Sequence, residues 1–244
     1  MDSKIFDCVK QIIETSSNIV FFGGAGVSTA SGIPDFRSAT GLYNQKQNSA
    51  YSPEYMLSHD FIVKHPDQFS DYVRQNLIYE EAKPNGAHKA LVKLEEQGKL
   101  KAVITQNIDG LHQQAGSNNV LELHGNLTDY YCSSCKKEYT QEEFCQGSGT
   151  FFCKQCGKVV RPKVVLYGEG LDMSVYWTAV KFIQQAEILI VGGTSLVVHP
   201  AAGLINYYHG HKLVLINMEK TSADFGADYI LQGDVSKILW DLVN

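Results

Sequence analysis

The sequence predicts an α/β fold, in which a doubly wound parallel sheet carries a smaller second lobe. Short apolar runs alternate along its 244 residues with stretches of helical periodicity, which is the pattern of consecutive βαβ units. Two segments interrupt this alternation: residues 43–83 are polar, aromatic and helix-like, and residues 130–160 hold two cysteine pairs. We expect both segments to be insertions that together form the smaller lobe.

The elements of the predicted sheet can be read in chain order. Residues 3–16 carry their apolar side chains on one helical stripe and lead into an apolar run at 19–22, which is a predicted buried strand. The later runs and periodic stretches predict further strands at 102–104, 187–191 and 213–216, and helices at 86–98 and 173–186.

The cysteines predict a metal site. Four of the six form two Cys-x-x-Cys pairs, Cys132 with Cys135 and Cys153 with Cys156, and 17 residues separate the pairs. This spacing is typical of a structural zinc site, in which four thiolates fill the tetrahedral shell and leave no position for water. The alternative is a redox Cys-x-x-Cys, but that motif normally opens a helix and is not duplicated. Cys145 lacks such spacing and is interpreted as a packing residue.

Composition excludes several classes of protein. Hydrophobic content of 44% and charged content of 19% are those of an ordinary globular protein, and the net charge of −5 does not favour direct nucleic-acid binding. The chain contains no apolar run long enough for a membrane helix, and its charged first residues do not resemble a signal peptide. Paired cysteines of the metal-binding kind favour a reducing compartment, so we expect a cytoplasmic protein.

A glycine turn follows the first strand, in the stretch GGAGVSTASGIPDFRS at 23–38. A dinucleotide fingerprint G-x-G-x-x-G requires a third glycine where Thr29 stands. Gly32 and Pro34 also end any helix here after two turns at most. The stretch therefore resembles a phosphate loop that changes early into a different structure.

Polar side chains follow four predicted strands, which are those at 102–104, 187–191 and 213–216 and a short apolar strand before His124. They occur in TQNIDGLH (105–112), LELHGN (121–126), GGTSLVVHPA (192–201) and LINME (215–219). Taken singly, each stretch can also be interpreted as a helix cap or a turn. Because the carboxyl ends of parallel strands form one ligand-binding edge, the four together predict a single cleft.

These motifs, with GAGVSTASGIPDFRS, RPKVVLYGEG (161–170) and the four cysteines, occur in the order found in the sirtuins. The chain resembles that family over nearly its whole length and is similar to compact bacterial-type members. Sirtuins are NAD-dependent protein lysine deacylases. The resemblance implies a Rossmann-like NAD-binding domain made of 1–42, 84–129 and 161–244, a helical insertion at 43–83 and a zinc-ribbon module at 130–160.

The resemblance also implies a mechanism. The amide oxygen of an acyl-lysine attacks the ribose carbon that bears nicotinamide, and the products are nicotinamide, deacylated lysine and O-acyl-ADP-ribose. His124 is the expected general base, with Asn107 and Asp109 as the other catalytic residues. Further NAD contacts are expected from the glycine turn, the segment that folds over the ribose, and three other strand ends: Gly24, Ala25, Gly26, Ile33, Asp35, Phe36, Arg37, Gln106, Gly193, Thr194, Ser195 and Asn217.

The expected partner is an acyl-lysine protein or peptide. Val165, Tyr167 and Gly168 would bind it, the backbone from 165 to 168 adding to the substrate as a β-strand edge. Many sirtuins have Phe at the position of Tyr167. Those that remove succinyl groups carry a Tyr-x-x-Arg pair in the helical insertion, whereas Asp71 precedes Arg74 here. We therefore expect neutral acyl groups, acetyl above all.

Other functions remain as alternatives. A sirtuin-like ADP-ribosyltransferase would share NAD cleavage but typically lacks the catalytic histidine, which is present here as His124. A dehydrogenase is disfavoured by the broken fingerprint. A zinc-ribbon binding module that only senses NAD is the non-enzymatic alternative. His88 and His112 also match family positions and are interpreted as structural residues.

Overall fold

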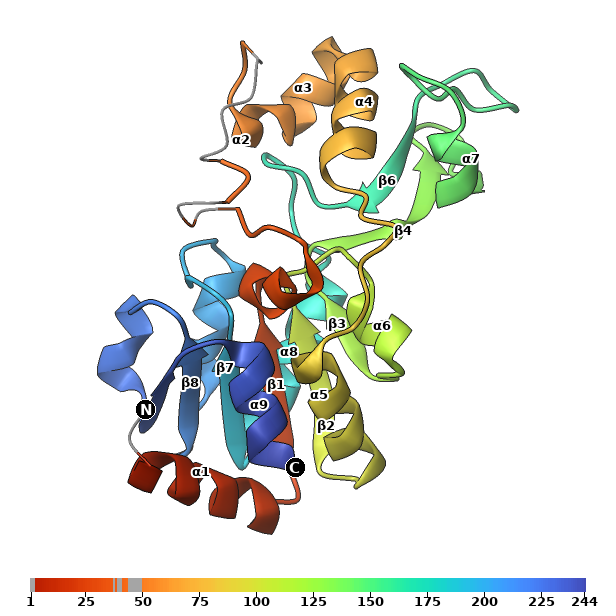
Figure 1. Ribbon diagram of the computed structural model, residues 1–244. Coiled ribbons are helices and arrows are strands. Elements are labelled where there is room, and N and C mark those ends of the chain that lie inside the picture. Colours follow the sequence, from red (N-terminus) through yellow and green to blue (C-terminus); the bar gives the residue numbers. More distant parts are fainter. Residues whose placement is uncertain (1–2, 37, 39–40, 44–49) are drawn as a thin grey trace.

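The computed structural model describes residues 3–36, 38, 41–43 and 50–244. Its larger lobe contains a six-stranded sheet in the order β3-β2-β1-β7-β8-β9, with every neighbouring pair parallel (Figure 1). Numbered within this sheet alone the order is 3-2-1-4-5-6, which is that of the doubly wound dinucleotide-binding fold. The strands are β1 (Ile19–Gly23), β2 (Leu100–Thr105), β3 (Val120–Glu122), β7 (Ile188–Gly192), β8 (Leu213–Asn217) and β9 (Tyr229–Gln232).

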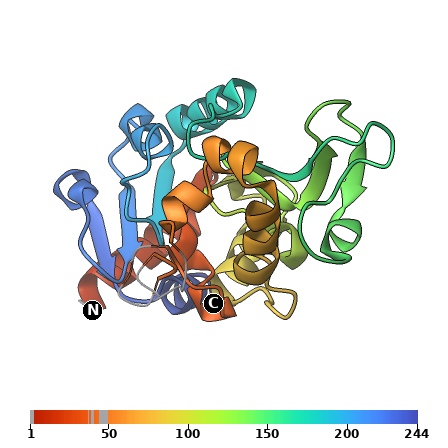
Figure 2. The same cartoon turned by 90° about the horizontal axis from the view of Figure 1, so that it is seen from above.

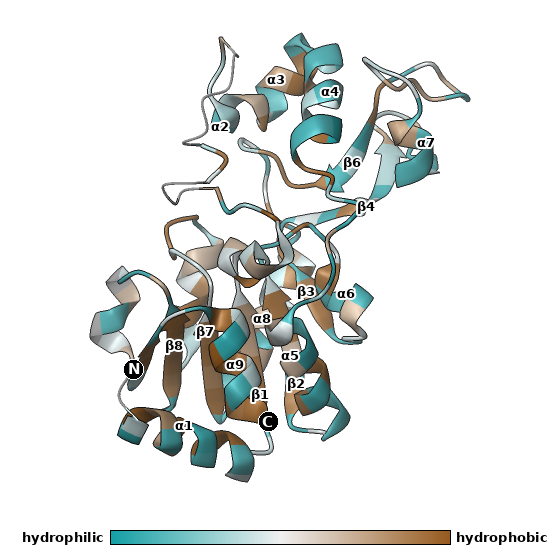
Figure 3. Ribbon diagram, in the orientation of Figure 1, coloured by the Kyte–Doolittle hydropathy of each residue, from teal (hydrophilic) through white to brown (hydrophobic). Residues whose placement is uncertain are grey.

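Helices cover both faces of this sheet, as the alternation in β1 requires. Ile19 and Phe21 join the core under α1, α5 and α9, whereas Val20 and Phe22 join the core under α8 and η3. Figure 3 shows the hydrophobic strands lying between helices with hydrophilic outer faces. The helical segments of this lobe are α1 (Ser3–Thr15), η1 (Ala25–Val27), η2 (Thr29–Ser31), α5 (Gly86–Glu96), α6 (Leu111–Ala115), α8 (Met173–Gln185), η3 (Ala201–Tyr207), η4 (Ser222–Gly226) and α9 (Val235–Val243).

The smaller lobe lies beyond the carboxyl ends of the sheet strands (Figures 1 and 2). It contains a three-stranded antiparallel sheet in the order β5-β4-β6. Helices from both expected insertions pack with it. The elements are α2 (Pro53–Met56), α3 (His59–Lys64), α4 (Pro66–Asn76), β4 (Gly125–Cys132), β5 (Glu138–Thr140), α7 (Gln141–Cys145) and β6 (Val160–Val164).

One hydrophobic core joins the two insertions. Phe61 and Phe69 from the helical segment and Tyr130, Phe144 and Val160 from the cysteine-containing segment are all buried in it. The predicted fold class, a doubly wound parallel sheet with a second lobe, is confirmed. In the described part of the chain, every helix is too short or too polar to cross a lipid bilayer.

Candidate active site

The two glycine loops meet at the point where the strand order reverses, between β1 and β7. The N–H of Gly26 donates to the Gly193 carbonyl over 2.8 Å, and the N–H of Gly24 donates to the Gly192 carbonyl over 3.2 Å. Gly193 has φ of +61°, and a Cβ there would lie 2.5 Å from the backbone nitrogen of Val27. Only glycine permits this approach. In doubly wound sheets, this crevice is where ligands bind.

Asn107 and Asp109 lie after β2 and share a contact with Ser28. The Ser28 hydroxyl donates to Asp109 Oδ2 over 2.6 Å and accepts from Asn107 Nδ2 over 3.0 Å. Burial raises the pKa of Asp109, and the hydrogen bonds from Ser28, Leu111 and Asn107 partly offset the rise. Both predicted residues are therefore held by a third, Ser28, that sequence reasoning missed.

A second hydrogen-bonded chain joins the ends of β2, β7 and β8. Gln106 Nε2 donates to the Thr194 hydroxyl over 2.9 Å, and the Thr194 N–H donates to Asn217 Oδ1 over 3.0 Å. Asn217 Nδ2 is buried and has no hydrogen-bonding partner among the described protein atoms. A buried amide donor without a protein partner suits the oxygen of a ribose hydroxyl, so the residues present fit a dinucleotide.

His124 follows β3 and contacts the same cluster. Its Nδ1 lies 3.0 Å from the backbone carbonyl of Gln106. Because a carbonyl only accepts, Nδ1 carries the proton and Nε2 has the free lone pair that a general base requires. Burial lowers the pKa of His124, and the hydrogen bond to Gln106 opposes this only in part. The imidazole is therefore neutral at neutral pH.

The backbone at position 125 explains why a glycine follows this histidine. Its φ is +72°, and a Cβ would lie 1.9 Å from the Lys163 carbonyl oxygen. Strand β4 therefore pairs closely with β6 directly after His124. The same crossing fixes the substrate loop, because the Val165 N–H donates to the His124 carbonyl over 2.9 Å.

The segment expected to fold over the ribose begins where η2 ends. Gly32 ends η2 with φ of +86°, which agrees with the early helix end that the sequence predicts. The N–H of Tyr43 donates to the Phe36 carbonyl over 2.9 Å, and Leu42 pairs in the same way with Asp35. Ile33 is half-buried, and Arg37 lies outside the described residues.

The predicted substrate loop, 165–168, is already tied to the helical insertion. The Tyr167 N–H donates to the Leu57 carbonyl, and the Tyr167 carbonyl accepts from the His59 N–H, each over 2.9 Å. These bonds occupy the backbone of Tyr167. Gly168 keeps an N–H without a protein partner in the part of the chain that the structure describes, so strand addition would begin there.

Arg161 and Glu169 hold the same loop from the other side. Arg161 binds both carboxylate oxygens of Glu169, at 2.5 and 2.9 Å, and donates to the Val164 carbonyl. Glu169 also accepts from the Leu166 N–H and contacts His59. Burial alone would raise the pKa of Glu169, but these partners, Arg161 first among them, lower it to about 2. The Glu169 carboxylate thus stays charged and keeps its bonds to Arg161 and the Leu166 N–H, which hold the substrate loop in place.

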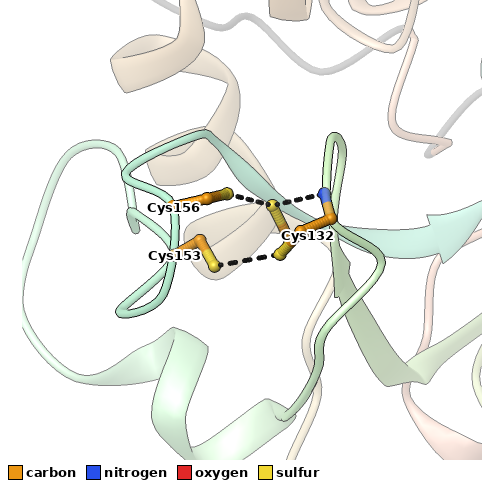
Figure 4. A group of neighbouring side chains, drawn as sticks. Cys132, Cys153 and Cys156 are labelled. Atoms are coloured by element: carbon orange, nitrogen blue, oxygen red, sulfur yellow. Dashed lines mark hydrogen bonds between the residues drawn. The ribbon is translucent and has the colours of Figure 1, made fainter.

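The four predicted metal ligands lie together between β4 and β6. Figure 4 shows Cys132, Cys153 and Cys156 turned toward one another. All four Sγ atoms lie within 4.8 Å of one another, with 3.3 Å from Cys132 to Cys156 and 3.5 Å from Cys135 to Cys153. Zinc–thiolate bonds of about 2.3 Å imply sulfurs about 3.8 Å apart in a tetrahedron. The four thiolates therefore fit a zinc ion.

Many of the predicted site residues are connected by hydrogen bonds, whereas the side chains of Ala25 and Ser195 are not. Hydrogen bonds join Gly24 and Gly26 to the β7 end, and Gln106 to His124, Thr194 and thereby Asn217. Ser195 is exposed and Ala25 half-buried, and neither side chain makes a hydrogen bond within the described region. Sequence reasoning also missed Asn85, whose side chain donates to the Val27 carbonyl and to Ser31. The sequence signal for Asn85 was its position directly after Pro84 and before a predicted helix, where a capping residue is expected.

A doubly wound sheet with polar side chains at four strand ends and a four-cysteine ribbon defines a class of zinc-containing, dinucleotide-binding proteins. The family model described as "Sir2 family" matches residues 24–200. A Clostridium perfringens protein named NAD-dependent protein deacetylase is 53% identical over all of both chains. One of the same name from Clostridium acetobutylicum is 54% identical over 95% of each. The chain belongs to the Sir2 family, the sirtuins.

Solved structures are similar over nearly the whole chain. A Sir2 complex with a p53 peptide and NAD+ has a TM-score of 0.85 at 40% identity, covering 99% of this chain and 97% of that one. A second Sir2 complex contains a deacetylated p53 peptide and 3'-O-acetyl ADP ribose. It has a TM-score of 0.88 at 38% identity, covering 96% of this chain and 95% of the other.

Proposed function

We propose that this chain is an NAD-dependent protein lysine deacetylase that forms nicotinamide, deacetylated lysine and O-acetyl-ADP-ribose. Family membership supports the reaction class, and the orientation of His124 carries the assignment to this chain. Its Nδ1 is committed to the Gln106 carbonyl, so a neutral Nε2 remains to accept a proton. When bound, NAD supplies the ribose carbon from which nicotinamide leaves.

The other residues then bind and orient the two substrates. The N–H groups of Gly24 and Gly26 bond to the β7 loop, so the Ala25 N–H is the one of the three suited to a pyrophosphate oxygen. Asn107 and Asp109 are connected through Ser28, and they would hold the nicotinamide-side ribose and carboxamide. Asn217 would receive the adenosine ribose. Positioning of this kind supplies much of the catalysis, because an amide oxygen is a weak nucleophile.

The acyl preference follows from Arg74. Its guanidinium donates to the carbonyls of Phe144 and Gly149, contacts Asp71, and lies 4.5 Å from the Phe144 ring centre. Only 11% of the Arg74 side chain is exposed, and these contacts all lie within the small lobe. It therefore offers no charge to a succinyl or malonyl carboxylate, which supports the preference for acetyl.

Mass spectrometry of the products tests both proposals. The protein is incubated with NAD and matched peptides carrying acetyl-lysine, succinyl-lysine or unmodified lysine. We expect O-acetyl-ADP-ribose and nicotinamide in equal amounts from the acetyl peptide, slower turnover of the succinyl peptide, and no reaction of the third. ADP-ribose added to the peptide would indicate the transferase alternative, and faster desuccinylation would contradict the role given to Arg74.

A cytoplasmic location belongs to the same proposal. The six cysteines are all free of disulfides, and four are arranged for a metal. Thiols of this kind persist in reducing compartments.

A further inference from the structure

The hydroxyl groups of Tyr43 and Tyr167 lie 2.8 Å apart. Tyr43 ends the described part of the segment that follows the glycine turn, and Tyr167 lies in the predicted substrate loop. The two residues are 124 positions apart in the chain. This contact joins the proposed cover of the dinucleotide to the proposed peptide site.

Tyr43 is firmly connected to Phe36. Its N–H donates to the Phe36 carbonyl over 2.9 Å, and the two aromatic rings have centres 5.4 Å apart. Leu42, its neighbour, is only 3% exposed and belongs to the hydrophobic core of the small lobe. A change in the position of Phe36 therefore reaches Tyr43 through both backbone and ring contacts.

Tyr167 is held equally well on its own side. Its backbone bonds to Leu57 and His59 fix it to the start of α3, and the Arg161–Glu169 pair fixes the residues around it. The hydroxyl is the part of this side chain that reaches the dinucleotide segment. A phenylalanine at this position would keep the ring and lose the contact.

We propose that the Tyr43–Tyr167 hydrogen bond couples binding of the dinucleotide to binding of the acyl-lysine peptide, with Tyr43 as a positioning residue. A ligand that holds either residue in the arrangement in which the hydroxyls meet favours the same arrangement for the other ligand, so each ligand strengthens binding of the other reciprocally. One neutral hydrogen bond corresponds to a coupling of about three- to tenfold in affinity. This inference rests on the proposed function.

Binding of an acetyl-lysine peptide, measured by calorimetry with and without saturating ADP-ribose, tests the coupling. The proteins compared are the unchanged chain, Tyr43→Phe, Tyr167→Phe and the double variant. We expect ADP-ribose to tighten peptide binding in the unchanged chain and the ratio of affinities to fall about three- to tenfold in each single variant. The ratio for the double variant should fall no further, because both substitutions remove the same hydrogen bond.

Tyr55→Phe is the matched control, because it removes another hydroxyl of the small lobe, one that contacts Asp60 over 3.3 Å. It should keep the ratio of the unchanged chain. An unchanged ratio in either single variant that folds, losses that multiply in the double variant, or an equal loss in the control would overturn the inference. Deacetylation by the unchanged chain is assayed in parallel: its absence would contradict the proposed function, and its presence with an unaltered ratio would contradict only the coupling.

Discussion

At the residue scale, the Gln106 carbonyl decides which nitrogen of His124 carries the proton. The same residue donates from its side chain to Thr194, so one glutamine links the proposed base to the β7 end. Asp109 is treated differently: burial raises its pKa, while Ser28 and the Leu111 N–H partly stabilise its charge. The site thus holds one neutral base and one carboxylate whose charge is stabilised by hydrogen bonds from Ser28, Leu111 and Asn107.

The pH dependence of catalysis should report the environment of His124. A base is active when unprotonated, and burial lowers the pKa of this imidazole below its ordinary value of 6.5. Activity should therefore persist as pH falls through 6.5 and decline only below it. The measurement is kcat/KM for an acetyl peptide between pH 5 and 8. An acid limb with its midpoint at or above 6.5 would contradict the geometry.

Individual site residues differ in how visible they are in the sequence. His124 and the residues of TQNID stand out because they are polar groups directly after apolar strands. Ser28 does not, since a serine after a glycine turn is ordinary cap chemistry, and only the fold brings it 2.6 Å from Asp109. The roles assigned to individual NAD and peptide contacts stay predictions.

At the element scale, the small lobe depends on contacts between segments far apart in the chain. Asp71 and Arg74 of α4 bind the backbone of Gly149, and Asp67 binds Thr150. Cys132 and Cys153 are buried in the core that the helical insertion shares. Loss of the metal would therefore loosen α3 and α4 as well as the ribbon.

Removal of zinc should destabilise the protein. We expect about one zinc ion per chain, and a fall of several degrees in the melting temperature after treatment with a chelator or in Cys135→Ser. Cys145→Ser is the control, because Cys145 is not among the four clustered thiols. It should retain the metal. A chain without zinc whose melting temperature does not respond to chelation would contradict the site.

The strands and helices were predictable where they were long, apolar or strongly periodic. The predicted strand at 19–22 is β1, that at 187–191 is β7, and that at 213–216 is β8, each within one residue at either end. Strand β9 went unrecognised because it is a short edge strand with a single buried residue, Leu231. The buried Val235, Ile238, Leu239 and Leu242 give α9 an amphipathic period that could have been found.

The boundaries between lobes were harder to predict. Strand β4 spans 125–132 and β6 spans 160–164, so each crosses an expected boundary of the zinc-ribbon segment. The two insertions were expected to form one lobe, but the side chains of their common core could not be inferred, because long-range packing has no local pattern. The division into a dinucleotide-binding domain, a helical insertion and a ribbon stays a prediction.

At the scale of the whole molecule, two buried histidines lie where α5 and α6 meet behind the site. His88 accepts the Asn85 N–H at Nδ1, and its ring centre lies 4.7 Å from that of His112. His88 Nε2 and both His112 nitrogens have no hydrogen-bonding partner among the described protein atoms. Burial lowers the pKa of His88 to about 4; burial, followed by the charge of His88, lowers that of His112 to about 3.

Stability should therefore fall on acidification. Above pH 6.5 both histidines are neutral in the folded and unfolded states, so they do not make the free energy of unfolding depend on pH. Below it the unfolded chain binds protons that the folded chain does not, so each histidine costs about 1.4 kcal/mol per pH unit until its folded pKa is reached. The free energy of unfolding is measured with urea at pH 7.5 and pH 5.0. Between these two pH values it should fall by about 2 kcal/mol less for His112→Leu than for the unchanged chain. His211→Leu, at an exposed position, should behave like the unchanged chain. Equal pH dependence of all three would contradict the burial of His112 as a neutral group.

The most direct measurement for the central claim is the rate at which nicotinamide is released from NAD, with and without an acetyl-lysine peptide. The unchanged chain should release nicotinamide only with the peptide, one molecule for each lysine deacetylated. His124→Ala, which removes the base but leaves the backbone contact to Val165, should lose about 10²- to 10⁴-fold in deacetylation. Nicotinamide release that ignores the peptide, or near-normal deacetylation by His124→Ala, would contradict a cleft in which both substrates meet beside this histidine.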